Sequence, residues 1–414
     1  MKTLGPFRVL RFRRSSRPLL ASLEVAFLVG STATADVAAQ AAQSPAANIW
    51  PARQVTIRQD ARAARVRIGI WDSGVDTSLF PGQLARDGQG RLLVRGYNAF
   101  KEREDTPMEV LPASILGRAG ELNEAFLALD DLDRGVESAR ANAFVRRLGT
   151  MAPMDSVTFQ QALGRWGGYT HGTAIADAAV AGNPRAEIVV ARMEWWHGSP
   201  PVPCWSRALA DREAATIRDQ LAFLVASGAR VVNMSWGRHE GSYRRALAEC
   251  APAVPEADRN ALARYTVDSI RAVLRAGMRA SPDVLFVGAA GNEGSSVTES
   301  NPATRFSLPN FLLVGAVDLA GARTAFTNTG PEVTLFAQGV AVPGRLPGGA
   351  VLLGDGTSVA APLVTNAAAK VLAVNPRLSG ADMRRLLETT ADTNSSGDRL
   401  LHAARAVEAA RGIR

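Results

Sequence analysis

Short runs of apolar and β-branched residues recur along the chain from Val66 onward, and each run ends near Gly, Asp, Asn or Ser. Near-continuous apolar runs of this length are typical of strands that are buried on both faces of a parallel sheet. The predicted strands are VRIGIWD (66–72), AEIVVARM (186–193), ARVVNMSWG (229–237), DVLFVGAAGN (283–292) and FLLVGAVD (311–318).

Amphipathic or Ala-rich helical patterns separate these runs, at 171–182, 214–229 and 263–280. Repeated strand, helix, strand order predicts an α/β fold, with a mostly parallel, doubly wound sheet as the middle of three layers. In such folds ligands bind beyond the carboxyl ends of the strands. The chemistry is therefore expected at residues that end the predicted strands, which are Asp72, Ser235, Trp236, Gly237, Gly291 and Asn292.

The charge of the chain is unevenly distributed. Of 414 residues, 47% are hydrophobic and 21% are charged, which is typical of a globular protein. The formal net charge is +8, but residues 1–35 contain six basic residues and one acidic residue, so the remainder has a net charge of only +3. A nucleic-acid-binding domain would keep a strong positive charge in its folded part. Nucleic acid is therefore not expected as a partner.

The N-terminus has the pattern of an export signal. Residues 1–35 combine a basic opening, a short apolar run and the small-x-small sequence Ala-Thr-Ala at 33–35, which predicts a signal peptide; an uncleaved amphipathic arm is the alternative. Residues 36–65 are interpreted as a linker or short pro-segment, and 66–414 as the main domain. No later run approaches 18 apolar residues, so no membrane span is expected.

Metal-ligating residues are sparse. The chain has two cysteines, Cys204 and Cys250, and four histidines, with no Cys-x-x-Cys pair, so a zinc site is not expected. The cysteines would form a disulfide in an exported protein or remain buried thiols in a cytosolic one. No carboxylate-rich loop has the spacing of a calcium site, and Asp76 and Asp177 are interpreted as helix-start and surface residues. A structural calcium ion remains possible, but no motif in the sequence supports one.

Four motifs each place one polar residue at a predicted strand end or helix start. Alone, each has an ordinary explanation: a turn for Asp72, a helix start for His171, a left-handed turn for Asn292 and an N-cap for Ser358. A helix start would also favour a neutral His171. Together they supply a carboxylate, a base, an oxyanion donor and a nucleophile. One active site explains all four better than four coincidences.

The order Asp, His, Ser differs from that of the α/β-hydrolases and of the chymotrypsin-like enzymes, and Ser358 lacks the Gly-x-Ser-x-Gly setting of lipases. The sequence instead resembles the subtilisin-like serine peptidases, the subtilase family, over about residues 66 to 410. The matching motifs are DSG at 72–74, HGT at 171–173, AAGN at 289–292 and GTSVAAP at 356–362.

This resemblance implies a subtilisin-like fold and a serine endopeptidase. Ser358 would attack the peptide carbonyl, His171 would transfer the proton and Asp72 would orient the imidazole. Asn292 and the Ser358 amide would form the oxyanion hole. No cofactor would be required, and the partner would be a polypeptide. This substrate would add as a strand to two segments, Ser235, Trp236 and Gly237, and Ala289, Ala290 and Gly291. Trp236 is open to two interpretations, a substrate-pocket wall or a packing residue.

Two features depart from the family's usual pattern. The interval of 99 positions from Asp72 to His171 includes an apparent insertion at about 101–165, with apolar residues at helical spacing. The insertion is either a helical decoration away from the cleft or an element that covers the cleft or contacts a partner. The segment 36–65 is also shorter than the prodomain of many secreted subtilases, so maturation is expected to differ. The helically spaced residues are Leu122, Phe126, Leu129, Leu132 and Val136.

Other functions remain as alternatives to an exported endopeptidase. A catalytically silent subtilase-fold binding protein would keep the cleft and use the insertion to hold a partner. An esterase on the same scaffold would use the same nucleophile. The complete set of four motifs argues against the silent protein, because a relaxed site should have lost at least one member.

Overall fold

The computed structural model describes residues 48–58, 63–133, 136–194, 203–297 and 306–413. The predicted signal peptide at 1–35 lies outside these residues, as do 36–47. A nine-stranded sheet crosses the middle of the described chain in the order β10-β11-β7-β6-β5-β4-β1-β3-β2. The seven strands from β2 to β7 in this order pair in parallel, and β10 pairs with β11 in antiparallel fashion. The prediction of a mostly parallel α/β sheet is confirmed.

All five predicted strands are present as β1, β3, β4, β5 and β6. Strands β4 and β5 each end three residues earlier than predicted, because residues 235–237 and 290–292 leave the sheet at its carboxyl edge, and β6 ends one residue earlier. The strands of the main sheet are β1 (Val66–Asp72), β2 (Val94–Tyr97), β3 (Ala186–Met193), β4 (Ala229–Met234), β5 (Leu285–Ala289), β6 (Phe311–Val317), β7 (Val333–Gln338), β10 (Asp392–Thr393) and β11 (Arg399–Leu400). A separate hairpin pairs β8 (Val342–Arg345) with β9 (Val351–Gly354).

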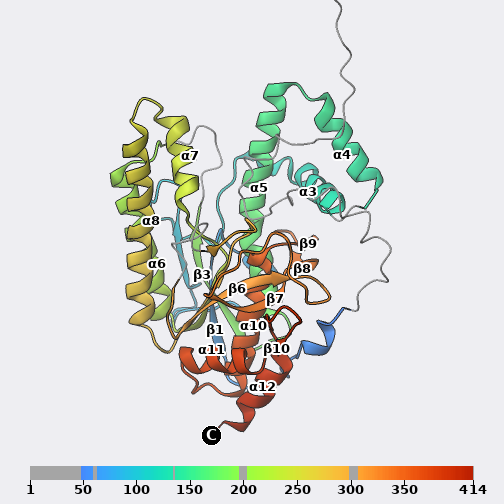
Figure 1. The fold of residues 1–414 in the computed structure, drawn as a ribbon, viewed down its shortest axis with the longest axis vertical. Helices are drawn as coiled ribbons and strands as arrows, with labels where there is room; N and C mark the ends of the chain where they lie inside the picture. Colours follow the sequence, from blue (N-terminus) through green and yellow to red (C-terminus); the bar gives the residue numbers. More distant parts are fainter. Residues whose placement is uncertain (1–47, 59–62, 134–135, 195–202, 298–305, 414) are drawn as a thin grey trace, which may run out of the picture.

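Helices cover both faces of the sheet (Figure 1). One layer contains α6 (Arg207–Ala226), α7 (Glu240–Cys250) and α8 (Glu256–Arg279), and the other contains α5 (Pro153–Val180) and α10 (Thr357–Val374). Among the described helices, α10 alone is long and apolar enough to cross a membrane, and 89% of it is buried as the central core helix. The chain closes with α11 (Gly380–Thr389) and α12 (Ala403–Gly412).

Strand β1 occupies the point at which the strand order reverses. It pairs with β3 on one side and with β4 on the other. From β1 the chain forms β2 at the far edge of the sheet and then β3 between β2 and β1. It then forms β4 to β7 in succession on the other side of β1. In doubly wound sheets this switch point opens a crevice at the carboxyl ends of the strands, where ligands bind. Asp72, the last residue of β1, therefore lies at the expected position for a functional site.

The insertion between Asp72 and His171 forms helices that project beyond the sheet (Figure 1). They are α2 (Ala113–Leu116), α3 (Ala119–Asp133), α4 (Ala139–Thr150) and the first half of α5. Leu122 and Phe126 are buried in a satellite core, which Leu346 and Leu352 of the β8–β9 hairpin complete. The predicted helical pattern is interrupted between α3 and α4, and Leu132 and Val136 are exposed. The insertion thus packs on the hairpin that leads into Ser358.

Residues 48–58 pack on the main domain although they show no apolar periodicity. Trp50 and Ile57 are buried in the same core as the central strands. The indole of Trp50 donates to the carbonyl of Asp318 at 2.9 Å, and the amide of Ile57 donates to Gly182 O at 2.9 Å. The packed body therefore includes residues in front of Val66.

Two short 3-10 helices, η1 (Pro51–Arg53) and η2 (Thr77–Leu79), complete the described elements.

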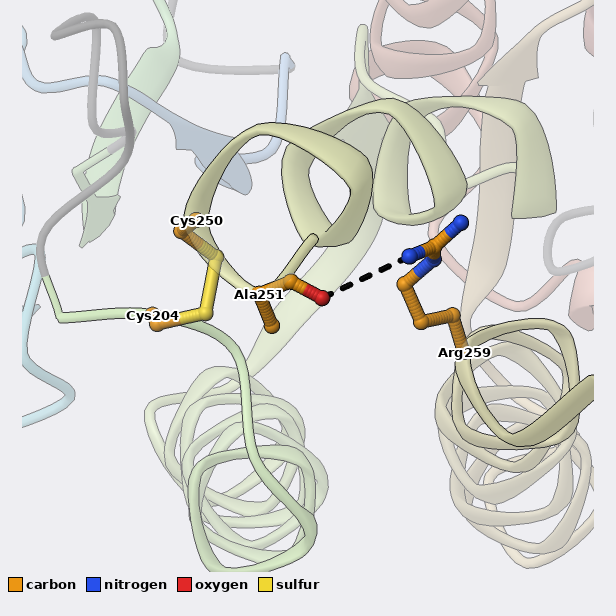
Figure 2. The surroundings of a disulfide bond; sticks show 4 residues. All are labelled: Cys204, Cys250, Ala251 and Arg259. Carbon is orange, nitrogen blue, oxygen red and sulfur yellow. Dashed lines mark hydrogen bonds between the residues drawn. A yellow bond between two sulfur atoms is a disulfide. The ribbon is translucent and has the colours of Figure 1, made fainter. Parts of the chain in front are cut away.

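A disulfide joins the start of the α6 layer to the end of α7 (Figure 2). Cys204 and Cys250 are bonded, with 5.4 Å between their Cα atoms. Beside this bond, Arg259 of α8 donates to the carbonyl of Ala251, and also to those of Pro252 and Val254. The bend between α7 and α8 is thus held from both sides. Of the two states that the sequence left open for the cysteines, the structure contains the disulfide.

Candidate active site

Asp72 and His171 form a buried pair at the switch point. Asp72 Oδ1 lies 2.7 Å from His171 Nδ1 and also accepts the Ser73 amide at 2.7 Å. Both side chains are almost completely buried. A carboxylate at Nδ1 selects the tautomer that carries its proton there, which places the basic lone pair on Nε2. A histidine oriented in this way has the form that a general base requires.

The expectation that His171 stands at a helix start is wrong. His171 lies in the interior of α5, which begins at Pro153 and has 28 residues. The helix continues through Gly167 and Gly168. A Cβ at Gly167 would lie 2.8 Å from the ring of Phe126, so the absence of a side chain there lets α3 pack against α5. The helix-dipole argument made from the sequence therefore does not apply to His171. The hydrogen bond to Asp72 sets its tautomer instead.

Two glycines let the helix of His171 approach the loop of Asp72. The amide of Gly172 donates to Ser73 Oγ at 3.0 Å. A Cβ built on Gly172 would lie 2.2 Å from the carbonyl oxygen of Gly74, well inside contact distance, and Gly74 itself has a φ of +130°. The close approach of α5 to β1 therefore depends on glycine at both positions.

Replacing Gly172 by alanine is expected to push α5 away from Asp72. Overpacking of this kind costs about 1–3 kcal/mol of folding free energy, and the activity of the site should fall further because the Asp72–His171 bond is displaced. Thermal unfolding and kcat measured on the same samples check this. Gly120→Ala is the control, because Gly120 of α3 faces open space. A Gly172→Ala variant with the parent's activity would contradict the packing argument.

Ser358 is the second residue of α10 and not its N-cap. The cap is Gly356, whose φ of +142° is a conformation that serine rarely adopts. Ser358 nevertheless lies in the first turn, where backbone amides lack acceptors within the helix. The carbonyl of Ser358 accepts from Ser235 Oγ at 2.7 Å, and Ser235 Oγ accepts from Asn233 at 2.9 Å. This chain of bonds ties the start of α10 to the end of β4.

Asn292 lies in the turn after β5, next to the start of α10. Its side-chain oxygen accepts from both the amide and the hydroxyl of Thr357, each at 2.8 Å. The Thr357 hydroxyl in turn accepts the amide of Gly291 at 3.0 Å. Because a backbone amide can only donate, the oxygen of Asn292 must face Thr357, which directs the NH2 group the other way. Asn292 thus presents a fixed donor beside Ser358.

The structure brings the predicted residues to one edge of the sheet. Asp72 bonds His171 directly, whereas Asn292 and Ser235 are each bonded to the first turn of α10. The segments 235–237 and 289–291 follow the neighbouring strands β4 and β5. Sequence reasoning assigned no role to three residues that hold this arrangement. They are Thr357, Asn233 and Thr365, whose hydroxyl donates to Asn233 at 3.0 Å. One of them, Thr357, lies inside the GTSVAAP motif, but the motif alone does not show its bond to Asn292.

Trp236 is a packing residue in this structure. It is 5% exposed, and its ring meets that of Trp71 edge-on with 5.1 Å between centroids. The guanidinium of Arg238 lies 5.4 Å from the centre of the same ring. Of the two interpretations that the sequence left open for Trp236, its burial against Trp71 favours a packing residue over a substrate-pocket wall.

A buried charge network lies behind this segment. Arg238 donates to Glu213 at 2.9 Å, Tyr243 donates to the same carboxylate at 3.1 Å, and Lys101 lies 3.8 Å from it. Burial opposes the ionisation of Glu213, but Lys101 and Arg238 outweigh it and hold its pKa below the ordinary value. The network therefore fixes Arg238, and with it the end of the segment after β4, by ionic hydrogen bonds.

The two carboxylates considered for calcium have structural partners. Asp76 caps η2 by accepting the Ser78 amide at 3.1 Å, and it also accepts the Gly348 amide at 2.9 Å. Asp177 binds Arg345. Among the described residues, no three His, Cys, Asp or Glu side chains gather as a metal site would require.

Comparison with known proteins agrees with this site. The family model Peptidase_S8, the subtilase family, matches residues 63–406. The chain belongs to the subtilase family. It is 28% identical over 264 residues to subtilisin amylosacchariticus from Bacillus subtilis subsp. amylosacchariticus, which covers 63% of this chain and 59% of that protein. Subtilisin from Bacillus pumilus is also 28% identical over 63% of this chain and 82% of its own length. The chain thus matches less than two thirds of the first of these relatives.

Solved structures show the same fold at low sequence identity. A lanthipeptide protease superposes with a TM-score of 0.51 at 15% identity, covering 84% of this chain and 89% of the other. The subtilase cytotoxin SubAB structure gives a TM-score of 0.50 at 17% identity, covering 84% and 90%. The subtilisin-like fold predicted from the sequence is confirmed.

Proposed function

We propose that this protein is a serine endopeptidase with the triad Asp72, His171 and Ser358. The observation that carries the proposal is the buried 2.7 Å contact between Asp72 Oδ1 and His171 Nδ1, at the switch point of a subtilase-family sheet. His171 takes the proton of Ser358 as the hydroxyl attacks the peptide carbonyl, and it returns this proton to the leaving amine. Water then attacks the acyl-enzyme ester with His171 as its general base. The bond between the acyl carbon and Ser358 Oγ breaks, Oγ takes the proton back from His171, and the acid product is released.

The oxyanion of the tetrahedral intermediate is stabilised by two donors. The NH2 group of Asn292 is directed away from Thr357, and the Ser358 amide belongs to the first turn of α10. Both donors are fixed before the substrate binds, which is the condition for electrostatic stabilisation of the transition state. The extended substrate pairs with the segments 235–237 and 289–291 in the manner of an added strand.

The proposed enzyme acts outside the cytosol. The predicted signal peptide at 1–35 supports export, and the bond between Cys204 and Cys250 is a modification that persists in oxidising compartments. We place the enzyme in the periplasm or the extracellular medium, with polypeptides as its substrates and no cofactor in the reaction. No membrane span is part of the proposal.

A serine-directed phosphonate tests the proposal. The parent protein is expected to be labelled at Ser358 and to degrade an unfolded protein, whereas Ser358→Ala should show neither reaction. Peptide mapping of the adduct identifies the labelled residue. A folded parent that is neither labelled nor active would overturn the proposal in favour of a catalytically silent binding protein. A parent that turns over esters but no peptide would point to an esterase.

A further inference from the structure

A buried asparagine from another part of the chain is hydrogen-bonded to the turn that carries Asn292. Asn328 lies in the connection between β6 and β7 and is completely buried. Neither the sequence motifs nor the proposed mechanism assigns it a role. A buried amide needs donors and acceptors for both of its ends, because an unsatisfied polar group costs about 1–3 kcal/mol.

Asn328 meets this need with the backbone on both sides of Asn292. Its side-chain oxygen accepts the amides of Glu293 at 3.1 Å and Ser295 at 2.9 Å. Its NH2 group donates to the carbonyl of Ala290 at 3.0 Å and to the carboxylate of Glu293. Its backbone amide donates to Gly291 O at 3.0 Å. Residues before and after Asn292 are thus bonded to one side chain.

The turn is shaped to admit this side chain. Gly291 has a φ of +102°, and a Cβ there would lie 2.3 Å from the NH2 nitrogen of Asn328. On its other side the turn is held by Thr357, which bonds both Gly291 and Asn292. Asn292 is therefore fixed between the start of α10 and Asn328.

We propose that Asn328 is a positioning residue for the oxyanion donor Asn292. It acts through Asn292, by holding the 290–295 turn in the position that directs the Asn292 NH2 group toward the developing oxyanion. The inference rests on the proposed peptidase function. Displacement of a catalytic group by about 1 Å can lower a rate roughly 100-fold, so loss of this clamp should appear in kcat.

The test compares Asn328→Ala with the parent on a peptide substrate. We expect kcat to fall about 10- to 100-fold while KM changes less than about twofold, because the clamp serves an interaction made in the transition state. Affinity for a peptide boronate, which mimics the tetrahedral intermediate, should fall in parallel. Active sites are counted by phosphonate titration, so that the rate is expressed per folded enzyme. An unchanged kcat in an active parent overturns the inference.

Two further variants separate positioning from stability. Asn328→Asp keeps the acceptor oxygen but loses donation to Ala290, so it should lose kcat even where the alanine variant is too unstable to purify. Asn310→Ala is the matched control, because Asn310 is also buried and donates to three carbonyls, those of Met278, Ser281 and Val284, at the opposite end of the strands. Asn310→Ala should lose stability without loss of kcat. An equal loss of kcat in this control would overturn the inference.

A double-mutant cycle gives the decisive result. If Asn328 acts through Asn292, then Asn328→Ala should lower kcat in the parent but have almost no further effect in an Asn292→Ala background. Fully additive losses would show that Asn328 acts elsewhere and would overturn the inference. The parent's own activity keeps the two proposals distinguishable: an inactive parent refutes the peptidase, whereas an active parent with additive losses refutes only the role of Asn328.

Discussion

Replacing Ser358, His171 or both by alanine is expected to lower kcat by the same factor, about 10⁶. The losses coincide because the serine without its base, or the base without its serine, leaves the same uncatalysed attack by water. The residual rate should still exceed that of free water about 10³- to 10⁴-fold, since Asn292 and the substrate-binding segments remain. Single-turnover measurements on a peptide substrate check this, with each variant's fold verified by circular dichroism.

Asp72→Asn tests the same triad from its buried end. An asparagine amide cannot hold the imidazole in the tautomer that the 2.7 Å contact with Asp72 selects, so kcat should fall about 10⁴-fold, less than for His171→Ala. A silent binding protein would show no such order of losses. Activity unaffected by His171→Ala would refute the triad.

The sequence predicts the sheet well because buried parallel strands carry their signal locally. The strand β1 is predicted without error at Val66–Asp72, and β3 at Ala186–Met193. Site residues follow from the same argument, since the fold brings the carboxyl ends of these strands together. The predicted positions of Asp72 and Asn292 needed only the strand ends and the motif, and no knowledge of tertiary contacts.

Helix starts were less predictable because tertiary contacts override local preference. Gly167 and Gly168 have low helix propensity, yet α5 continues through them, since the absence of a side chain at Gly167 allows Phe126 to pack there. At α10 the N-cap is Gly356, because the cap position has a φ of +142° that favours glycine. Ser358, a good capping residue, therefore lies inside the first turn. In both cases the deciding partner or backbone angle is not visible in the local sequence.

The residues that hold the site in place could not be inferred at all. Glu213 and Lys101 are separated by more than a hundred positions, and Asn328 contacts a turn 35 positions before it. Such pairs show no periodicity, and any buried Asn or Glu has many conceivable partners. A single sequence therefore predicts which residues react, whereas the structure is needed to show what positions them.

A buried lysine without a carboxylate partner among the described residues is the basis of the second large effect. Lys370 of α10 is 5% exposed, and burial lowers its pKa from 10.5 to about 8. Its ammonium faces Gly182, where an added Cβ would lie 3.4 Å from Nζ, just beyond the end of α5. The carbonyls of a helix end offer partial negative charge, which offsets only part of the lost hydration.

The lowered pKa makes the stability of the fold depend on pH. The unfolded chain binds a proton at Lys370 up to about pH 10.5, whereas the folded chain releases it above about pH 8. The burial penalty is thus complete below pH 8 and is relieved as the pH rises from 8 to 10.5, so this residue makes the fold more stable in that window. The full difference corresponds to about 3 kcal/mol.

Replacing Lys370 by methionine should therefore raise the free energy of unfolding at pH 7 by up to about 3 kcal/mol, and the gain over the parent should shrink as the pH approaches 10.5. Urea unfolding across pH 7 to 10 checks this, with the difference between the two proteins cancelling the other titrating groups. Lys370→Arg is the matched control. Because arginine stays charged over this range, this variant should lack the rise in stability that Lys370 contributes above pH 8. A methionine variant less stable than the parent at pH 7 would show that the ends of α5 and α10 solvate the ammonium fully. The central helix of this fold would then need its buried charge.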